Sequence, residues 1–444
     1  MRWFAFAFCA SAIAVGTGAA ALHIAVERLG PPKLDKVREV STTVLDRRDQ
    51  LLRAFTTREG RWRLPVAADE VDERYLAMLM AFEDKRFYSH SGIDARALMR
   101  AAWQFAHNGY IVSGGSTLTM QVARLIEGRH ERTAAGKLRQ IVGALLLERH
   151  LTKQEILALY LRIAPFGGNI EGVRAASLTY FGKEPNRLSV AEAALLVALP
   201  QSPEARRPDR NSQAARAARD RVLERMVGAG VISRVEAARA HGEPVPHSRR
   251  AFPKLAAHLA ETEVLAATTK SVHRLTIDRS VQAALEALAT EQARLLGQKL
   301  SAAILAVDHT TNEVIAHVGS AGYLDDERLG AIDMVTAVRS PGSTLKPFIY
   351  GLAFEAGIAH PETLIEDRAV RFGTYAPKNF DNVFHGTVTI REALARSHNI
   401  PAVKVLAAVG PGKLVGRLRR IGVEPAFPDE TAPTLAMALG GVGL

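Results

Sequence analysis

The sequence contains a single cysteine, Cys9, which excludes an internal disulfide framework and a cysteine-based metal site. Aromatic residues make up only 6% of the chain. Neither a basic stripe interleaved with aromatic residues nor a zinc-ligand spacing occurs, which argues against a nucleic-acid-binding protein. The sequence also lacks internal repeats and low-complexity tracts, so a repeat architecture is excluded.

The composition fits a multidomain globular protein with an anionic partner. The chain has 444 residues, of which 48% are hydrophobic, enough for two or three domains with real cores. Lysine and arginine number 57 against 46 acidic residues, which gives a net charge of +11. With nucleic acid disfavoured, this surplus predicts a membrane surface or a phosphorylated substrate as the partner.

Residues 3–22 carry no charge and are almost wholly apolar. About 20 helical residues span about 30 Å, the thickness of a bilayer core. A signal peptide cleaved near residues 19–21 is the alternative, but its apolar region would usually be about 7–15 residues long. We therefore expect an uncleaved, single-pass anchor with Arg2 on the cytoplasmic side, and the chain after Pro32 outside the membrane.

Periodicity predicts a change of fold class along the chain. Apolar residues at helical spacing dominate from about residue 69 to 228, with a helix over 190–199 that stops at Pro200. A strand over 274–278, a helix over 281–296 and a hairpin of 302–307 with 313–318 then begin an α/β (α+β) domain. The predicted parts are a cytoplasmic tip and anchor (1–30), a membrane-proximal hairpin linker (31–60), a mostly α domain (61–230), a second linker (231–272) and the α/β domain (273–444).

The densest chemistry lies between Glu83 and Gly92, where two carboxylates, two cations, two aromatic residues and a histidine occur in one run. Glu83 directly follows the apolar run 76–82, so it is expected at the rim of a packed helix, a position that suits acid–base work. A solvated helix end, with Asp84 paired to a neighbouring cation, is equally compatible with this stretch alone.

Residues 114–124 form the second polar stretch of the helical region. Thr117, Gln121 and Arg124 recur at helical spacing on one side. A hydroxyl, an amide and a guanidinium on one face suit a sugar joined to a phosphate. The alternative is a capped surface helix with Ser116 as its N-cap.

Two further stretches give weaker evidence of a binding site when each is taken alone. Residues 137–140 place two cations within three positions, which could hold a diphosphate or be solvated. Between Tyr160 and Lys183, glycines alternate with aromatic residues, for which a structural role is the simpler interpretation.

Together, and in this order, the four stretches resemble the peptidoglycan glycosyltransferase domain of the class A penicillin-binding proteins, glycosyltransferase family 51, over residues 69–208. The resemblance implies a mostly helical, lysozyme-like fold lying against the membrane. It also implies an enzyme that polymerises lipid II: the growing lipid-linked glycan is joined to the 4-hydroxyl of the incoming disaccharide, and undecaprenyl diphosphate is expelled.

The resemblance assigns roles to individual residues. Glu83 would be the general base that deprotonates the acceptor hydroxyl. Asp84, Phe87 and His90 would shape the acceptor site, and Thr117, Gln121, Arg124, Lys137 and Gln140 would surround the donor sugar and diphosphate. Fixed cations would stabilise the charge on the leaving diphosphate. A divalent cation, Mg²⁺ or Mn²⁺, shares this task in some family members.

Gln140 departs from the family pattern, which usually has a second glutamate in this third stretch. A glutamine can neither ligate a metal as an anion nor exchange a proton. The Gly-Lys-Leu-Arg-Gln sequence that ends at Gln140 resembles the pattern of the 1C subfamily of the class A penicillin-binding proteins. Whether Glu148 or Arg139 compensates stays open, and Arg162 replaces a common asparagine.

A second group of residues resembles the penicillin-binding transpeptidase domain. Ser343-Thr344-Leu345-Lys346 is a Ser-x-x-Lys motif, and Ser397-His398-Asn399 follows downstream. Ser343 would be the acylated nucleophile, Lys346 its proton acceptor, and Ser397 and Asn399 the second polar wall. No Lys-Thr-Gly or Lys-Ser-Gly follows Asn399 before Leu444, so we expect an incomplete transpeptidase domain.

The leading hypothesis is a glycan polymerase anchored in the bacterial inner membrane, with its catalytic domains in the periplasm. Its expected partners are lipid II, the growing glycan, membrane lipid, other cell-wall synthesis proteins and β-lactams. The alternatives are a non-catalytic membrane-anchored scaffold or β-lactam receptor, and a lytic muramidase. Gln140 and the missing third motif favour the scaffold, whereas a muramidase needs a carboxylic acid and water rather than a cluster of cations.

Overall fold

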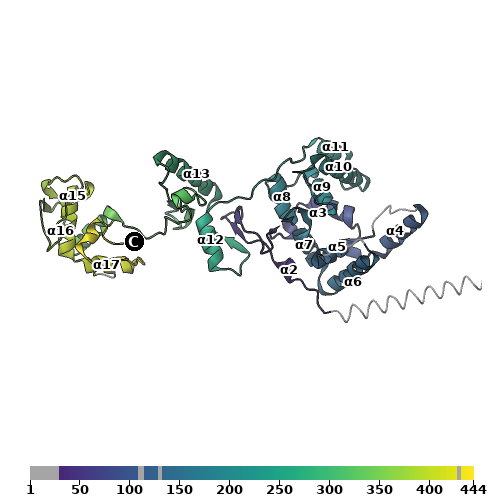
Figure 1. Ribbon diagram of the computed structural model, residues 1–444, viewed down its shortest axis with the longest axis horizontal. Coiled ribbons are helices and arrows are strands. Elements are labelled where there is room, and N and C mark those ends of the chain that lie inside the picture. Colours follow the sequence, from purple (N-terminus) through teal and green to yellow (C-terminus); the bar gives the residue numbers. More distant parts are fainter. Residues whose placement is uncertain (1–29, 109–114, 129–132, 428–431) are drawn as a thin grey trace, which may run out of the picture. The chain divides into compact units, whose positions relative to one another are not determined.

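The computed structural model describes residues 30–108, 115–128, 133–427 and 432–444 (Figure 1). The predicted anchor, residues 3–22, lies outside the described residues. Within these described ranges, no helix combines the length and the apolar character needed to cross a bilayer. The chain divides into two compact units, Met1–Ile332 and Asp333–Leu444, so the second unit begins later than residue 273, where the sequence pattern changes class.

The predicted hairpin after residue 40 is confirmed. Strands β1 (Thr43–Leu45) and β2 (Leu51–Ala54) pair antiparallel, and the Asp46 carboxylate accepts backbone bonds from Arg48 and Gln50 at 2.7 and 2.8 Å, which closes the turn. β6 (Val272–Arg274) joins β1 in parallel and gives the order β2-β1-β6.

The strand predicted over 274–278 is wrong beyond Arg274. Asp278 instead caps α13 (Arg279–Leu296), because its side chain accepts hydrogen bonds from the backbone of Ser280 and Val281. The helix predicted over 281–296 therefore exists and starts two residues earlier.

The first unit contains the mostly helical domain that the periodicity predicted. Its helices are α2 (Asp35–Arg38), α3 (Glu73–Glu83), α4 (Ala95–Asn108), α5 (Leu118–Glu127), α6 (Ala134–His150), α7 (Lys153–Ile163), α8 (Val173–Phe181), α9 (Val190–Ala198), α10 (Ser212–Gly228) and α11 (Arg234–Gly242), with short helical turns η1 (Ala68–Glu70), η2 (Phe87–Ser89), η3 (Pro185–Arg187) and η4 (Leu199–Gln201). The short strands β3 (Trp62–Arg63), β4 (Pro165–Gly167) and β5 (Ile170–Glu171) form a sheet of order β3-β5-β4.

Helix α9 is the centre of this domain. Residues 193–199 of α9 and η4 are buried, and α3 and α10 pack against α9 (Figure 1). A helix that is apolar on all sides needs cover on all sides, which explains its central place. Ser189 and Glu192 form a capping box that sets its start. On α3, Tyr75, Met78 and Leu79 face this core, so the helix is anchored up to its final residue, Glu83.

The end of the first unit carries the predicted second hairpin. β7 (Ile304–Val307) and β8 (Val314–Val318) pair antiparallel as a two-stranded sheet, with η5 (Asp326–Arg328) after them. α12 (Ala257–Ala266) contributes Ala260 to a small core with Val44, Leu52 and Ile277, which ties this region to the first hairpin.

The second unit is built around a buried helix, α16 (Asn399–Val409). Its other elements are η6 (Gly342–Leu345), α14 (Lys346–Glu355), β9 (Leu364–Asp367), β10 (Gly386–Thr389), α15 (Ile390–Ala395), α17 (Pro411–Arg420) and η8 (Leu435–Leu439). β9 and β10 pair antiparallel, and α14 packs against α16, so the two sequence motifs that begin these helices come together.

Candidate active sites

Glu83 is a half-buried carboxylate held by two neutral amides. Its Oε2 accepts a hydrogen bond from Nε2 of Gln121 on α5 at 2.7 Å, and its Oε1 accepts one from Nε2 of Gln201 on η4 at 2.9 Å. Three elements that are distant in sequence therefore fix the orientation of one carboxylate.

Gln201 is a site residue that the sequence motifs missed. Its side-chain oxygen Oε1 accepts a hydrogen bond from Nη1 of Arg206 at 3.2 Å, and the same nitrogen donates to the backbone carbonyl of Ala198 at 2.7 Å. The available signal was a polar residue directly after Pro200, at the end of a mostly apolar helix.

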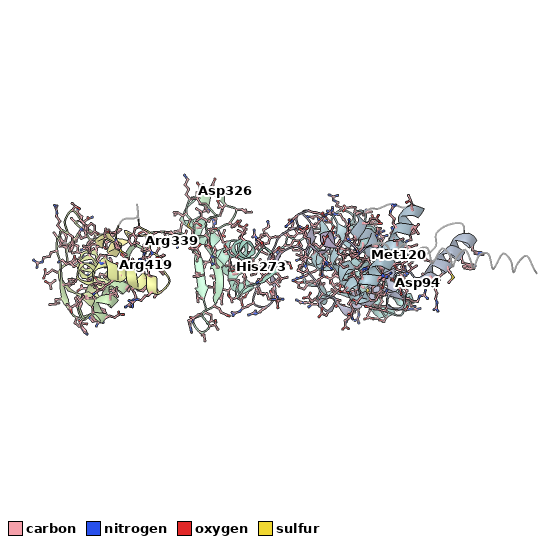
Figure 2. The ribbon with its side chains drawn as sticks, turned by 90° about the horizontal axis from the view of Figure 1, so that it is seen from below. Asp94, Met120, His273, Asp326, Arg339 and Arg419 are labelled. Carbon is pink, nitrogen blue, oxygen red and sulfur yellow. The ribbon has the colours of Figure 1, made fainter. Side chains whose placement is uncertain are left out.

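Asp84 is a buried structural anchor rather than a solvated helix end. Nε2 of His90 lies 3.0 Å from both carboxylate oxygens of Asp84, and the backbone nitrogen of Leu118 donates to Oδ2 at 2.9 Å. Arg86, which a solvated helix end would have paired with Asp84, binds Asp94 instead. Asp94 directly precedes α4 (labelled in Figure 2). Asp84 thereby joins the end of α3 to the start of α5.

Thr117, not Ser116, caps α5. Its Oγ1 accepts from the backbone nitrogen of Met120 at 3.1 Å and donates to the Gly92 carbonyl at 2.6 Å, so the hydroxyl is fully committed to protein partners. Ser116 accepts a hydrogen bond from Nζ of Lys137. The sequence alternative of a Ser116 cap is therefore wrong by one residue.

Phe87 lies in the core, with 1% of its surface exposed, and Nζ of Lys153 lies 4.5 Å from its ring centroid. Neither Phe87 nor His90 lines the cleft described next. His90 contacts Asp84, and the Phe87 ring lies edge-on to the His90 ring with centroids 6.4 Å apart, so both support the cleft wall through Asp84.

A cleft of about 960 Å³ opens beside Glu83. Its charged lining comprises the cations Lys85, Arg86, Arg100, Arg124 and Arg225 and the acids Glu83, Asp84 and Asp94, and its neutral polar lining includes Ser116, Thr117, Gln121, Gln140 and Gln201. Cations outnumber acids, so the cleft attracts an anionic ligand. Of the predicted residues, Glu83, Asp84, Thr117, Gln121, Arg124 and Gln140 are brought together here.

Lys137 lies next to this lining. Its Nζ contacts Oε1 of Gln140 at 3.5 Å, and burial, followed by the charge of Arg124, lowers the pKa of Lys137. Glu148 is occupied elsewhere, by Thr119 at 2.7 Å and Lys153 at 2.6 Å, and Arg139 pairs with Glu127 at 3.2 Å. Neither side chain lines the cleft to replace a glutamate at position 140.

The donor set of the cleft does not fit a dedicated Mg²⁺ or Mn²⁺ site. Hard cations favour several oxygen ligands with carboxylates among them. Asp84 is bound by His90 and Asp94 by Arg86, which leaves Glu83 beside amides and guanidinium groups. We therefore derive no catalytic step through a metal in this cleft.

The second unit gathers Lys346, Ser397 and Asn399. Nζ of Lys346 donates to the Ser397 carbonyl at 2.6 Å, to Ser397 Oγ at 3.1 Å and to Asn399 Oδ1 at 2.7 Å. Burial lowers the pKa of Lys346 to about 8. Ser397 has a positive φ of 56°, a backbone conformation that costs a non-glycine residue energy and is common at functional sites.

Ser343 lies in η6, one turn before Lys346, and its side chain is exposed. The backbone nitrogen of Lys346 donates to the Ser343 carbonyl oxygen, but in the described part of the chain no hydrogen bond joins their side chains. Three of the four predicted residues of this group are thus in contact, with the fourth beside them and open to solvent.

Comparison with known proteins identifies two domains in this order. Residues 48–227 match the family model described as Transglycosylase, and residues 302–433 match the Penicillin binding protein transpeptidase domain. Penicillin-binding protein 1C of Escherichia coli (strain K12) is 45% identical over 417 residues, which cover 94% of this chain and 54% of that protein. Penicillin-binding protein 1F of Bacillus subtilis (strain 168) is 31% identical over 440 residues, covering 95% of this chain and 60% of that protein.

This chain therefore spans little more than half the length of the curated relatives it matches. Among solved structures, penicillin-binding protein 1A from Haemophilus influenzae aligns with 91% of this chain and 66% of its own, at 17% identity and a TM-score of 0.42. The two structures superpose only in part, so the family of this chain is assigned from the sequence matches. Both domain matches and the identity to the 1C protein show that the chain belongs to the class A penicillin-binding proteins and is 1C-like.

Proposed function

We propose that the chain is a peptidoglycan glycosyltransferase that polymerises lipid II and releases undecaprenyl diphosphate. The observation that carries the proposal is the placement of Glu83. Its hydrogen-bond partners are neutral amides, whereas Asp84 and Asp94 in the same cleft are held by His90 and Arg86. Glu83 is thus an oriented carboxylate that forms no ion pair with any described lysine or arginine, beside a cationic lining.

In this proposal Glu83 is the general base. It takes the proton from the 4-hydroxyl of the incoming disaccharide while that oxygen forms a bond to the anomeric carbon of the growing glycan. The bond from that carbon to the diphosphate oxygen breaks, and the electron pair leaves with undecaprenyl diphosphate. Gln121 and Gln201 each use one lone pair of a carboxylate oxygen, so further lone pairs stay available to the hydroxyl.

The leaving diphosphate gains negative charge as this bond breaks. Arg124 lines the cleft and Lys137 lies beside Gln140, so both can stabilise that charge without moving far. Asp84, Phe87, His90 and Thr117 act through other residues, because their polar groups are engaged or their rings are buried. We assign them positioning roles.

The place of action follows from the same chemistry. A lipid-linked substrate has to be met at a membrane, and the apolar run 3–22 and the net charge of +11 suit an anchored protein at an anionic surface. We propose a single-pass protein of the inner membrane with both units in the periplasm.

A polymerisation assay tests the proposal. The 444-residue chain supplied with labelled lipid II is expected to form polymer, and Glu83→Gln is expected to form none. Glu73→Gln, at the exposed start of the same helix, is the matched control and should polymerise normally. Polymer from the Glu83→Gln protein would overturn the role of Glu83.

The same assay separates the other candidate functions. Release of soluble sugars from purified cell wall, without polymer, would favour a lytic muramidase. Absence of both activities, with binding to cell-wall synthesis proteins retained, would favour a scaffold.

The contacts of Lys346 support a second activity, covalent reaction with β-lactams. Ser343 Oγ would attack the lactam carbonyl, the lactam C–N bond would open, and the serine proton would reach the lactam nitrogen through neutral Lys346. Labelling by a fluorescent penicillin that is lost in Ser343→Ala tests it. Labelling that persists in that variant would place the reaction at another residue.

A further inference from the structure

The second unit contains a group of metal-ligating side chains apart from the Lys346 contacts. Asp367 ends β9, His385 directly precedes β10, and His398 immediately precedes α16. One ligand atom from each of these three residues lies within 4.8 Å of the others. Among the residues that the structure describes, this is the one group of three or more histidine, cysteine, aspartate or glutamate side chains that lie close enough together to hold a metal ion.

Two features distinguish this group from a solvated acidic cluster: Asp367 and His398 are buried, and one histidine nitrogen lacks a hydrogen-bond partner among the described residues. Asp367 has 0% of its surface exposed, and its partners are the side-chain amide of Asn379 at 2.8 and 3.0 Å and the backbone nitrogen of His385 at 3.0 Å. Among the residues that the structure describes, no lysine or arginine side chain forms an ion pair with Asp367. His398 is 6% exposed, and its Nε2 has no hydrogen-bond partner among the described residues.

The two imidazole rings lie face to face, with centroids 4.2 Å apart and planes 29° from parallel. A buried nitrogen without a partner is costly, since it has lost its water and gained nothing in exchange. A bound cation would remove that cost and neutralise Asp367 in the same step. The carboxylate of Asp381 contacts Nε2 of His385 at 3.0 Å, the kind of contact that orients a metal-bound histidine.

We propose that Asp367, His385 and His398 bind a divalent transition metal of the zinc class, with Asp381 holding or completing the ligand set. Imidazole nitrogen and carboxylate oxygen suit zinc, whose bonds to them are about 2.0–2.2 Å, and binding would turn the stacked rings so that one nitrogen of each points at the ion. Magnesium and calcium require mostly oxygen ligands and do not match two histidines. The proposal does not depend on the glycosyltransferase activity.

The site would stabilise the polar wall around Lys346. Asp367 holds the amide of Asn379, and Oδ1 of Asn379 accepts the backbone nitrogen of Asn399 at 2.9 Å. Asn399 in turn accepts from Lys346, and His398 is the residue between Ser397 and Asn399. A metal at this point would fix the segment that keeps Ser397 at positive φ.

Metal content tests the proposal directly. The tag-free 444-residue chain, loaded with Zn²⁺ and dialysed, is expected to retain about one zinc per chain by mass spectrometry of the metal. His385→Ala and His398→Ala should each reduce this to background, while His247→Ala, an exposed histidine of the first unit, should retain it. Zinc retention by the double variant His385→Ala/His398→Ala equal to that of the wild type would overturn the proposal.

A second measurement uses the unmodified chain, so it does not depend on a variant that folds. Zinc is expected to raise the thermal unfolding midpoint of the second unit, and excess Mg²⁺ should not displace it. Co²⁺ in place of zinc should give the visible absorption of a four-coordinate nitrogen–oxygen site. A wild-type chain that retains no zinc, or that loses it to Mg²⁺, would refute a transition-metal site.

Discussion

Nε2 of Gln201 donates a hydrogen bond to Oε1 of Glu83 at 2.9 Å, although the two residues are 118 positions apart in the chain. Arg206 in turn donates to the side-chain oxygen Oε1 of Gln201. The orientation of the proposed base therefore depends on a turn after α9 as well as on α5.

Removing that amide should slow polymerisation. Gln201→Ala leaves Gln121 as the one amide partner of Glu83 among the described residues. A hydrogen bond to a charged group contributes about 1.5–3 kcal/mol, or roughly tenfold or more in rate. We expect the initial rate with lipid II to fall by about that factor. An unaltered rate would show that Gln121 alone orients the base.

Asp84→Ala should affect stability more than Glu83→Gln does. The substitution leaves the His90 ring and the Leu118 backbone nitrogen buried without their acceptor, a loss of about 2–4 kcal/mol. We expect a clear drop in the unfolding midpoint of the first unit, followed by circular dichroism. Asp69→Asn, an exposed carboxylate on η1, is the control, and an equal effect of both changes would contradict the anchor role.

Gly92 occupies a position that excludes any side chain. Its φ is +88°, and a Cβ would lie 2.9 Å from the Ala144 carbonyl oxygen. Gly92→Ala is expected to cost about 1–3 kcal/mol, because strain and overpacking add. Gly228→Ala, where a Cβ meets open space, should be neutral or slightly stabilising in the same unfolding measurement.

The reaction of Ser343 should depend on the protonation of Lys346. Burial lowers the pKa of Lys346 to about 8 from 10.5, and only its neutral form accepts a proton. Labelling by a fluorescent penicillin should rise with pH up to about 8 and then level, and Lys346→Arg should not label. A flat profile between pH 6 and 9 would rule out Lys346 as the acceptor.

The contribution of Lys346 to folding stability should also increase as pH rises. Between pH about 8 and 10.5 the unfolded chain keeps a proton on Lys346 that the folded chain has lost. The unfolded state then binds more protons, so the contribution of Lys346 to folding becomes more favourable as pH rises through this window and is least favourable below it.

Local patterns predicted the chemistry that lies on single elements. Glu83 at a helix end and Gln121 on a helix face could be expected from spacing, and the meeting of Lys346 with Asn399 from the resemblance to the transpeptidase domain. Contacts that depend on tertiary packing could not be expected from the sequence. Ser116 and Thr117 are equally good caps in sequence, and the Gly92 carbonyl decides between them.

The same reason explains what the motifs omitted. Gln201 reaches Glu83 because α3 packs on α9, and the Asp367 group depends on the way β9 and β10 bring loops together. Nothing in the spacing of Asp367, His385 and His398 matches a familiar metal-binding pattern, since their proximity arises from the fold.

The glutamine at position 140 has a consequence for inhibitor design. A compound for this cleft needs an anionic group for the arginine side chains and a cationic group for Glu83. In relatives with a glutamate in place of Gln140, that cationic group would find a further carboxylate, whereas here it finds a neutral amide at that position. Compounds selected on such relatives should lose affinity for this protein, and a neutral hydrogen-bonding group aimed at Gln140 should recover selectivity for it.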